Sequence, residues 1–157
     1  MLLRNIQNDD FLRVSTILNA WWGGRNMVDM LPRLFFNHFQ ETSFIVEDEG
    51  RTMGFLIGFV SPTRPEEAYI HFVGVNPSAR QKNIGRDLYE HFFKVVRFKG
   101  CQEVSCVTSP INTTSIKFHQ KLGFSMKTSD HIIDGLPIHL SYDGVGEDRV
   151  VFVRSLV

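Results

Sequence analysis

A change of apolar period runs through Val73-Gly74-Val75-Asn76-Pro77-Ser78-Ala79-Arg80-Gln81-Lys82-Asn83-Ile84-Gly85-Arg86-Asp87-Leu88. Up to Val75 the apolar residues are typical of a strand, and from Ile84 they recur at the spacing of an amphipathic helix. Asn76-Pro77 separates the two halves, because proline cannot continue a strand ladder. The stretch therefore predicts a strand, a short polar loop and a helix.

The loop between this strand and this helix is suited to hold an anion. Successive main-chain N–H groups in such a loop, together with the free N–H groups of the first helical turn, form a cup for negative charge. Arg80, Lys82 and Arg86 add positive charge around the cup, and Gly85 would let the backbone approach a ligand closely. A diphosphate is the natural guest. The alternative is an ordinary strand-to-helix connection with a solvated basic face.

The flanking segments continue the alternation of strands and helices. Apolar runs bounded by turn residues predict strands over 2–6, 43–47, 53–60, 68–75, 104–108 and 149–156, and one that begins at 124. Helical spacing predicts helices from 9 or 10 to 21, over 27–39, from 84 to a stop at 100, and from a cap at 112 to 123.

The order of these segments predicts the fold class. A strand-helix-strand crossover favours parallel pairing of 68–75 with 104–108, whereas the hairpin of 43–47 and 53–60 favours antiparallel pairing. We therefore expect an α/β fold with one mixed, twisted sheet of about six to seven strands and helices on both faces. The length of 157 residues fits a single domain over 1–157.

Composition narrows the class of partner. The 17 basic and 17 acidic side chains give a net charge of zero, and no basic stripe stands out, which argues against nucleic acid as a ligand. The longest apolar run, 53–60, is too short to span a bilayer, and the N-terminal residues are charged too early for a signal peptide. The expectation is a cytoplasmic protein with no membrane partner.

The chain contains two cysteines, Cys101 and Cys106. Five residues apart in an apparent strand, they would point to opposite faces of the sheet, so a disulfide between them is not expected. Free cysteines are most often buried, and two alone make no metal site. We predict two buried thiols and no metal.

A second informative segment reads Asn112-Thr113-Thr114-Ser115-Ile116-Lys117-Phe118-His119-Gln120-Lys121-Leu122-Gly123-Phe124. It resembles the Asn…Phe-Tyr-x-x-Leu-Gly-Phe helix of the GNAT superfamily of N-acetyltransferases. The loop resembles the acetyl-coenzyme A signature of the same family, Arg/Gln-x-x-Gly-x-Gly/Ala, which stands here as Arg80-Gln81-Lys82-Asn83-Ile84-Gly85. The order of elements agrees too, so the resemblance covers nearly the whole chain.

Two residues depart from the family pattern. Asn83 replaces the first glycine of the signature, and His119 stands where the family usually has tyrosine. Asparagine tolerates a left-handed backbone better than most residues, so the loop is expected to keep its shape.

The resemblance implies that acetyl-coenzyme A is the cosubstrate and that its acetyl group moves to an amine. It also implies that the fourth and fifth strands splay at one end, where the pantetheine arm binds to strand backbone. The residues that the resemblance and the loop chemistry assign to the cofactor are Val73, Val75, Arg80, Gln81, Lys82, Asn83, Ile84, Gly85, Arg86 and Asn112.

Two histidines are candidates for proton transfer. His119 lies where the family's acid lies, and we predict that it protonates the departing thiol; the alternative is a satisfied helix histidine packed beside Phe118. His71 is the candidate base, because strand alternation would put Tyr69, His71 and Val73 on one face and imidazole has a suitable pKa. The alternative is an ordinary cross-strand polar contact.

Residues for the acceptor are harder to assign. We predict that the amine-bearing substrate meets Trp21, Trp22, Arg25, Tyr69 and Tyr142. Anchoring in the core is the alternative for the tryptophans, since tryptophan is highly buried on average. The favoured activity is acetylation of a small-molecule amine by direct attack on the thioester. Acetylation of a protein N-terminus or lysine and a non-catalytic acyl-coenzyme A-binding module are the alternatives, and the resemblance makes a homodimer possible.

Overall fold

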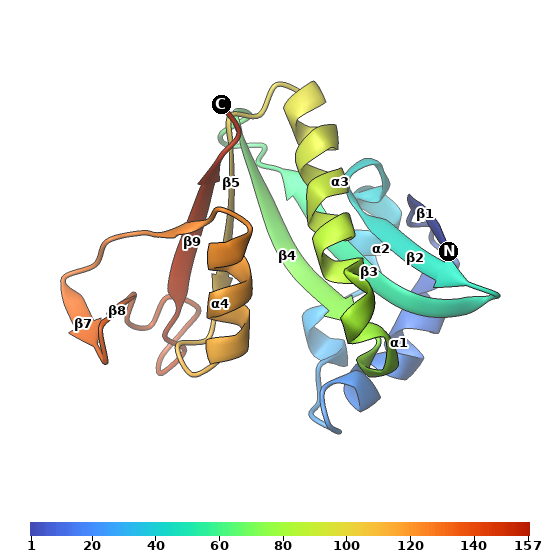
Figure 1. Ribbon diagram of the computed structural model, residues 1–157, viewed down its shortest axis with the longest axis horizontal. Coiled ribbons are helices and arrows are strands. Elements are labelled where there is room, and N and C mark those ends of the chain that lie inside the picture. The colour runs from blue at the N-terminus through green and yellow to red at the C-terminus, as the bar shows by residue number, and fades with distance from the viewer.

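Seven strands form one mixed sheet in the computed structural model (Figure 1). Along the chain they are Leu2–Asn5 (β1), Phe44–Asp48 (β2), Arg51–Val60 (β3), Glu67–Val75 (β4), Glu103–Thr108 (β5), Ser125–Met126 (β6) and Val150–Ser155 (β9). In space their order is β1-β2-β3-β4-β5-β9-β6, and His131–Ile133 (β7) and Leu136–Ile138 (β8) form a separate hairpin. The structure describes residues 1–157 except the side chain of Gln81, so the predicted contact of that side chain lies outside the described part.

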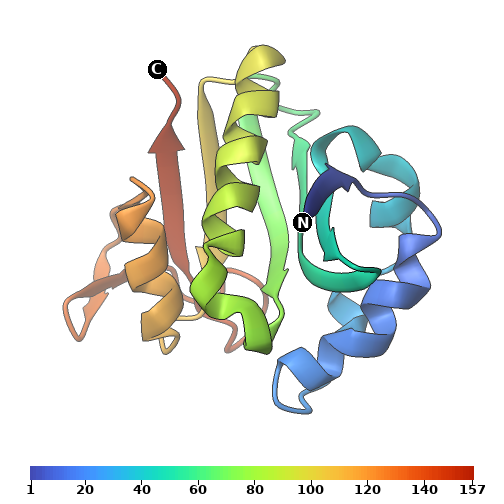
Figure 2. The ribbon, with the colours of Figure 1, turned by 45° about the vertical axis from the view of Figure 1, so that its right-hand side comes forward.

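Helices cover both faces of the sheet, as predicted (Figures 1 and 2). One face carries Asp10–Trp21 (α1) and Leu34–His38 (α2), and the other carries Ile84–Phe98 (α3) and Thr113–Lys121 (α4). Short 3-10 helices span Val28–Met30 (η1), Gln40–Thr42 (η2) and Pro77–Lys82 (η3). Of the helices in the described part of the chain, none has the length and apolar character needed to cross a membrane.

One predicted helix is wrong. The segment 27–39 contains only η1 and the five residues of α2, because Pro32 interrupts it. A residue before proline is pushed out of helical geometry, and Leu31 has φ −136° and ψ 66°.

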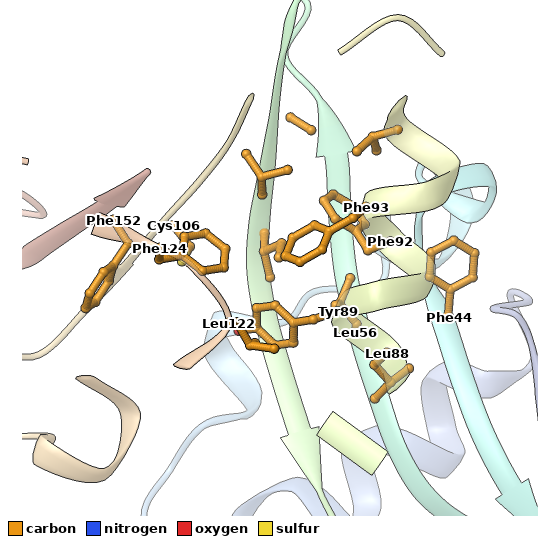
Figure 3. Packing of buried hydrophobic residues seen from close by; sticks show 14 of the residues in the cluster. Phe44, Leu56, Leu88, Tyr89, Phe92, Phe93, Cys106, Leu122, Phe124 and Phe152 are labelled. Atoms are coloured by element: carbon orange, nitrogen blue, oxygen red, sulfur yellow. The ribbon is translucent and has the colours of Figure 1, made fainter. Parts of the chain in front are cut away.

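The core lies in two layers, one on each side of the sheet. On one side, Phe92 and Phe93 of α3 are buried against the strands, and the same cluster contains Phe124, whose ring lies 5.9 Å from that of Phe93, and Phe152 (Figure 3). On the other side, α1 and α2 bury Leu18 and Phe36. These layers fix the position of β4, which passes through the middle of the molecule.

Both cysteines are buried free thiols, as predicted. Their predicted location in one strand is wrong for Cys101, which precedes β5 and donates a hydrogen bond from Sγ to the carbonyl oxygen of Pro65 at 3.5 Å. Cys106 lies within β5.

The predicted splay between the fourth and fifth strands is confirmed. β4 and β5 are parallel and pair at only three positions, Glu67 with Glu103, Ala68 with Val104 and Tyr69 with Ser105. Beyond Tyr69 the two strands separate, which Figure 1 shows as a widening gap between β4 and β5.

Candidate functional site

The backbone of β4 is unmatched along the gap. The N–H of Asn76 donates to the carbonyl oxygen of Met53 in β3 at 2.9 Å. Because successive residues of a strand direct their N–H and C=O groups to alternate edges, Val73 and Val75 direct theirs away from β3 and toward the gap. These two valines therefore offer main-chain donors and acceptors to an extended ligand.

A β-bulge at His71 divides β4. Ile57 of β3 pairs with Phe72 and Gly58 pairs with Ile70, so His71 is the additional residue. The bulge turns Val73 toward the α3 side, whereas the ring of His71 stacks on Phe35 of α2. The predicted common face for Tyr69, His71 and Val73 is therefore wrong for Val73, because simple alternation does not hold across a bulge.

The ring of His71 has one nitrogen committed. Its Nε2 lies 2.7 Å from the carbonyl oxygen of Met30, and the ring lies 4.3 Å from that of Phe35. A carbonyl oxygen only accepts, so Nε2 carries a proton, and in the neutral ring Nδ1 carries the lone pair. Among the described residues Nδ1 has no hydrogen-bond partner, which is the state that a general base requires.

The loop between β4 and α3 has the expected shape. Asn83 adopts a left-handed backbone, with φ 59° and ψ 23°, between η3 and the first residue of α3. Arg80, Lys82 and Arg86 are exposed around it. Within the part of the chain that the structure describes, none of these three cations makes a salt bridge. Their charge is therefore available to an anion.

At two predicted cofactor residues, Ile84 and Gly85, the side-chain position faces the core of the protein rather than the solvent. The side chain of Ile84 is buried, and a Cβ built on Gly85 would lie 3.3 Å from Cζ of Phe118 in α4. Gly85 therefore allows α3 to approach α4, and a ligand at these positions meets main chain only. The side chain of Asn112 caps α4 by accepting a hydrogen bond from the N–H of Ser115 at 3.1 Å, as predicted.

His119 is buried in the core rather than exposed in the gap. Its Nδ1 lies 2.7 Å from the carbonyl oxygen of Ser115, so Nδ1 carries the proton. Nε2 then accepts a hydrogen bond from the hydroxyl of Tyr89 at 2.8 Å, and the ring stacks on Phe152 at 4.9 Å. Burial lowers the pKa of His119, with partial opposition from the bond to Ser115. Both nitrogens of the neutral ring are thus occupied.

Tyr89 was not among the predicted site residues. It lies on the inner face of α3, and burial raises its pKa well above the ordinary value. Helical spacing marks it as a core aromatic, but no sequence signal connects it with His119, which is 30 residues away.

A cavity of about 290 Å³ lies beside the point where β4 and β5 separate. Tyr69, the last residue of β4 that pairs with β5, is part of its wall. The lining residues are Phe59, Ser61, Arg64, Glu67, Tyr69, Tyr142 and Asp143. Two of the five predicted acceptor residues, Tyr69 and Tyr142, are therefore brought together from distant parts of the chain.

The charges of this cavity are already paired. Arg64 donates from Nε to Oε2 of Glu67 at 2.6 Å, and Ser105 donates to Oε1 of the same carboxylate at 2.8 Å. Burial alone would raise the pKa of Glu67, but the hydrogen bonds from Arg64 and Ser105 outweigh it and lower the pKa. Asp143 accepts a hydrogen bond from Nε of Arg149 at 2.8 Å. Sequence reasoning missed Arg64 and Glu67, whose i, i+3 spacing alone indicates only a local ion pair.

The other three predicted acceptor residues do not line this cavity. Trp21 stacks on Phe55 at 6.0 Å and Trp22 packs against Phe72 at 5.1 Å, so both tryptophans anchor the end of α1 to the sheet. Arg25 is exposed in the loop after α1.

A larger cavity of about 590 Å³ lies over η2 and the end of β3. It shares Phe59 with the smaller cavity, but none of the predicted catalytic, cofactor or acceptor residues with described side chains lines it. The smaller cavity is the better candidate for chemistry, because it adjoins the gap in the sheet.

Comparison with known proteins gives a family match over most of the chain. Residues 4–124 match the model of the acetyltransferase (GNAT) family. The L-2,4-diaminobutyric acid acetyltransferase of Virgibacillus pantothenticus is 32% identical over 82 residues, which is 52% of this chain and 52% of that protein. The chain therefore matches about half the length of this curated relative.

Solved structures share the fold. A diaminobutyrate acetyltransferase from Paenibacillus lautus, in complex with L-2,4-diaminobutyric acid and coenzyme A, superimposes with a TM-score of 0.69 at 22% identity, covering 98% of this chain and 93% of that one. The ribosomal-protein-S18-alanine N-acetyltransferase of Escherichia coli gives a TM-score of 0.70 at 18% identity, covering 99% and 93%. At these identities the likeness establishes the architecture alone.

Proposed function

The chain belongs to the acetyltransferase (GNAT) family, and from that premise we propose that it transfers an acetyl group from acetyl-coenzyme A to the amine of a small-molecule acceptor. The observation that carries the proposal is the gap between β4 and β5. The exposed cations around Asn83 lie past the C-terminal end of β4, and the cavity of about 290 Å³ lies at the closed end of the gap.

The described residues fit acetyl-coenzyme A. Its diphosphate would meet the main-chain N–H groups from Asn83 to Arg86 and the side chains of Arg80 and Lys82. Its pantetheine arm would bond to the backbone of Val73 and Val75 as an added strand. When bound, the cofactor supplies a thioester, whose carbonyl carbon is activated toward amines.

The transfer needs a neutral amine. We propose that Nδ1 of His71 takes a proton from the acceptor nitrogen as that nitrogen attacks the carbonyl carbon. A new C–N bond forms, the charge that develops on the carbonyl oxygen is stabilised by a backbone N–H near Val73, and the C–S bond then breaks. The sulfur leaves as a thiolate, which gains a proton to give coenzyme A.

His119 stays our candidate donor of that last proton, but the structure sets a condition. Because Nε2 accepts a hydrogen bond from Tyr89 and Nδ1 donates to Ser115, His119 must first gain a proton at Nε2, and the Tyr89 hydroxyl must turn away. The alternative from the sequence, a histidine satisfied within the helix, agrees with the same contacts. The variants His119→Phe and Tyr89→Phe separate the two.

The size of the cavity favours a small acceptor. A volume of about 290 Å³ suits a metabolite, whereas a peptide acceptor needs an open groove. The curated relative named for diaminobutyric acid supports a small amine as well.

A thiol-release assay tests the proposal. Purified protein and acetyl-coenzyme A would be offered amino acids, diamines, polyamines, aminoglycosides and peptides with free N-termini. We expect release of coenzyme A with at least one small amine and none above background with the peptides. Release with peptides alone would favour the protein acetyltransferase, and binding of coenzyme A without release by any amine would favour a non-catalytic module.

A further inference from the structure

The lining of the cavity carries both signs of charge in fixed places. Arg64 supplies a guanidinium at the mouth, where its side chain is 62% exposed. Glu67 and Asp143 supply carboxylates, and Arg149 behind Asp143 offsets the charge of Asp143. Glu147, on the outer side of Arg149, is 3.4 Å from it. The lining of the cavity is therefore not uniformly negative, as a binding site for a polycation would be.

Each paired residue of the cavity keeps hydrogen-bonding capacity for a ligand. Arg64 uses only Nε in its bond to Glu67, so Nη1 and Nη2 have no partner among the described residues. Asp143 uses Oδ2 toward Arg149, so Oδ1 is likewise without a described partner. The two Nη groups match a carboxylate in a bidentate manner, and Oδ1 matches an ammonium group.

Reactive basic amino acids have the complementary charge. An amine must be neutral to attack a thioester, so a diamino acid with its distal amine deprotonated has one carboxylate, one α-ammonium group and no net charge. We propose that the cavity selects a small diamino acid, with its carboxylate on Arg64, its α-ammonium group on Asp143 and its distal amine directed past Tyr69 into the gap. This inference rests on the function proposed above and specifies its substrate class.

Aromatic side chains complete the fit. The rings of Phe59 and Tyr69 pack together at 5.6 Å and form an apolar wall for the methylene chain between the two ends of such a substrate. Burial raises the pKa of Tyr69, so its hydroxyl stays protonated and can donate to the substrate. Charged groups for one end of the ligand and an apolar wall for its chain suit a diamino acid better than a polyol or an aminoglycoside.

Matched substrates test the inference without any mutation. Ornithine, putrescine and 5-aminovalerate share a chain that ends in a primary amine, but putrescine lacks the carboxylate and 5-aminovalerate lacks the α-ammonium group. The shorter set is 2,4-diaminobutyrate, 1,3-diaminopropane and 4-aminobutyrate. In at least one set we expect kcat/KM for the diamino acid to exceed that of both analogues by about tenfold or more, since each analogue lacks the charge-assisted contact with either the Nη groups of Arg64 or Oδ1 of Asp143.

Two variants test which residue binds the carboxylate of the substrate and which binds its α-ammonium group. Arg64→Gln should reduce the preference for the diamino acid over the diamine by about tenfold and leave the preference over the ω-amino acid in place. Asp143→Asn should reduce the preference for the diamino acid over the ω-amino acid and leave the preference over the diamine in place. The control is Arg51→Gln, which removes an exposed arginine at the start of β3 and should change neither preference.

Calorimetry of the same compounds with protein saturated in coenzyme A gives a readout independent of turnover. We expect the diamino acid to bind more tightly than either analogue. Equal rates and equal affinities for all three compounds of both sets, or equal effects of both variants on all substrates, would overturn the inference while leaving an acetyltransferase. No thiol release with any amine would instead overturn the proposed function.

Discussion

The charged side chains at the two ends of strand β4 differ, since among the described residues they are unpaired at one end and paired at the other. Past its C-terminal end, Arg80, Lys82 and Arg86 are exposed and make no salt bridge within the described chain. At its N-terminal end, Arg64 and Glu67 are paired with each other. Unneutralised positive charge suits a ligand with several negative charges, such as a diphosphate, whereas balanced charge suits a ligand that has both signs. One strand can therefore separate the cofactor from the acceptor by electrostatics.

The largest effect is expected between these two ends, at the bulge. His71→Ala should lower the rate at saturating substrate about 100-fold, because Nδ1 would no longer accept the amine proton. His38→Ala, which removes an exposed histidine of α2, is the control. Full activity of the His71 variant from pH 6 to 9 would mean that several weak groups and water remove the proton.

Neutralising the C-terminal end should weaken cofactor binding alone. The double variant Arg80→Gln, Lys82→Gln is expected to raise the Kd for coenzyme A about 10- to 100-fold, because two charge-assisted contacts are lost. Calorimetry at low and high salt would measure it, with the larger loss at low salt. Lys94→Gln, an exposed cation farther along α3, should bind like the wild type. An unchanged Kd in the double variant would mean that these cations do not bind the diphosphate, so the two ends of β4 would not differ in the way described.

The Tyr89–His119 pair allows a test with opposite outcomes. If His119 protonates the thiol, His119→Phe should lower turnover about tenfold or more with little change in cofactor affinity. Tyr89→Phe should keep turnover, because it frees Nε2, but should lower the free energy of unfolding by about 1–3 kcal/mol, since a buried acceptor loses its donor. Turnover that is unchanged in His119→Phe would give the pair a structural role only.

Asn83 permits a smaller test of loop geometry. Asn83→Gly should keep or tighten coenzyme A binding, because glycine adopts φ 59° without strain. Asn83→Val should lower the free energy of unfolding by about 1–2 kcal/mol, since a β-branched residue resists the left-handed region. A large loss of affinity in the glycine variant would show that the asparagine side chain itself contacts the ligand.

The smallest effect concerns protonation of His119. Burial lowers its pKa, so the unfolded chain binds more protons at this site once the pH falls below about 6.5. The contribution of His119 to the free energy of unfolding is therefore fully present above pH 6.5 and is lost as the pH falls from 6.5 through the lowered pKa of the folded state. NMR titration should place the His119 midpoint below 6.5, and a midpoint above 6.5 would contradict the buried neutral ring.

Much of the cofactor end could be predicted from sequence because one continuous stretch forms it. Strand, loop and helix follow one another from Val73 to Leu88, and the left-handed tolerance of asparagine correctly predicted the backbone at Asn83. Pro32 also signals a break, since the residue before proline avoids helical geometry, but the prediction of one helix over 27–39 followed the apolar spacing instead.

The acceptor end could not be predicted in the same way. Its cavity joins Arg64 and Glu67, next to β4, with Tyr142 and Asp143 from the loop before β9. Only the three-dimensional fold brings these segments together. The bulge at His71 was likewise hidden, because an inserted residue leaves the local residue types unchanged while it reverses the faces that follow.

Binding of coenzyme A and of pantetheine, compared by calorimetry with the folded wild-type protein, tests the central claim most directly. The account predicts that coenzyme A binds at least about 100-fold more tightly than pantetheine, because the exposed cations and main-chain N–H groups past the end of β4 grip the diphosphate. Equal affinity for the two compounds, or no heat with coenzyme A at millimolar concentration, would contradict it.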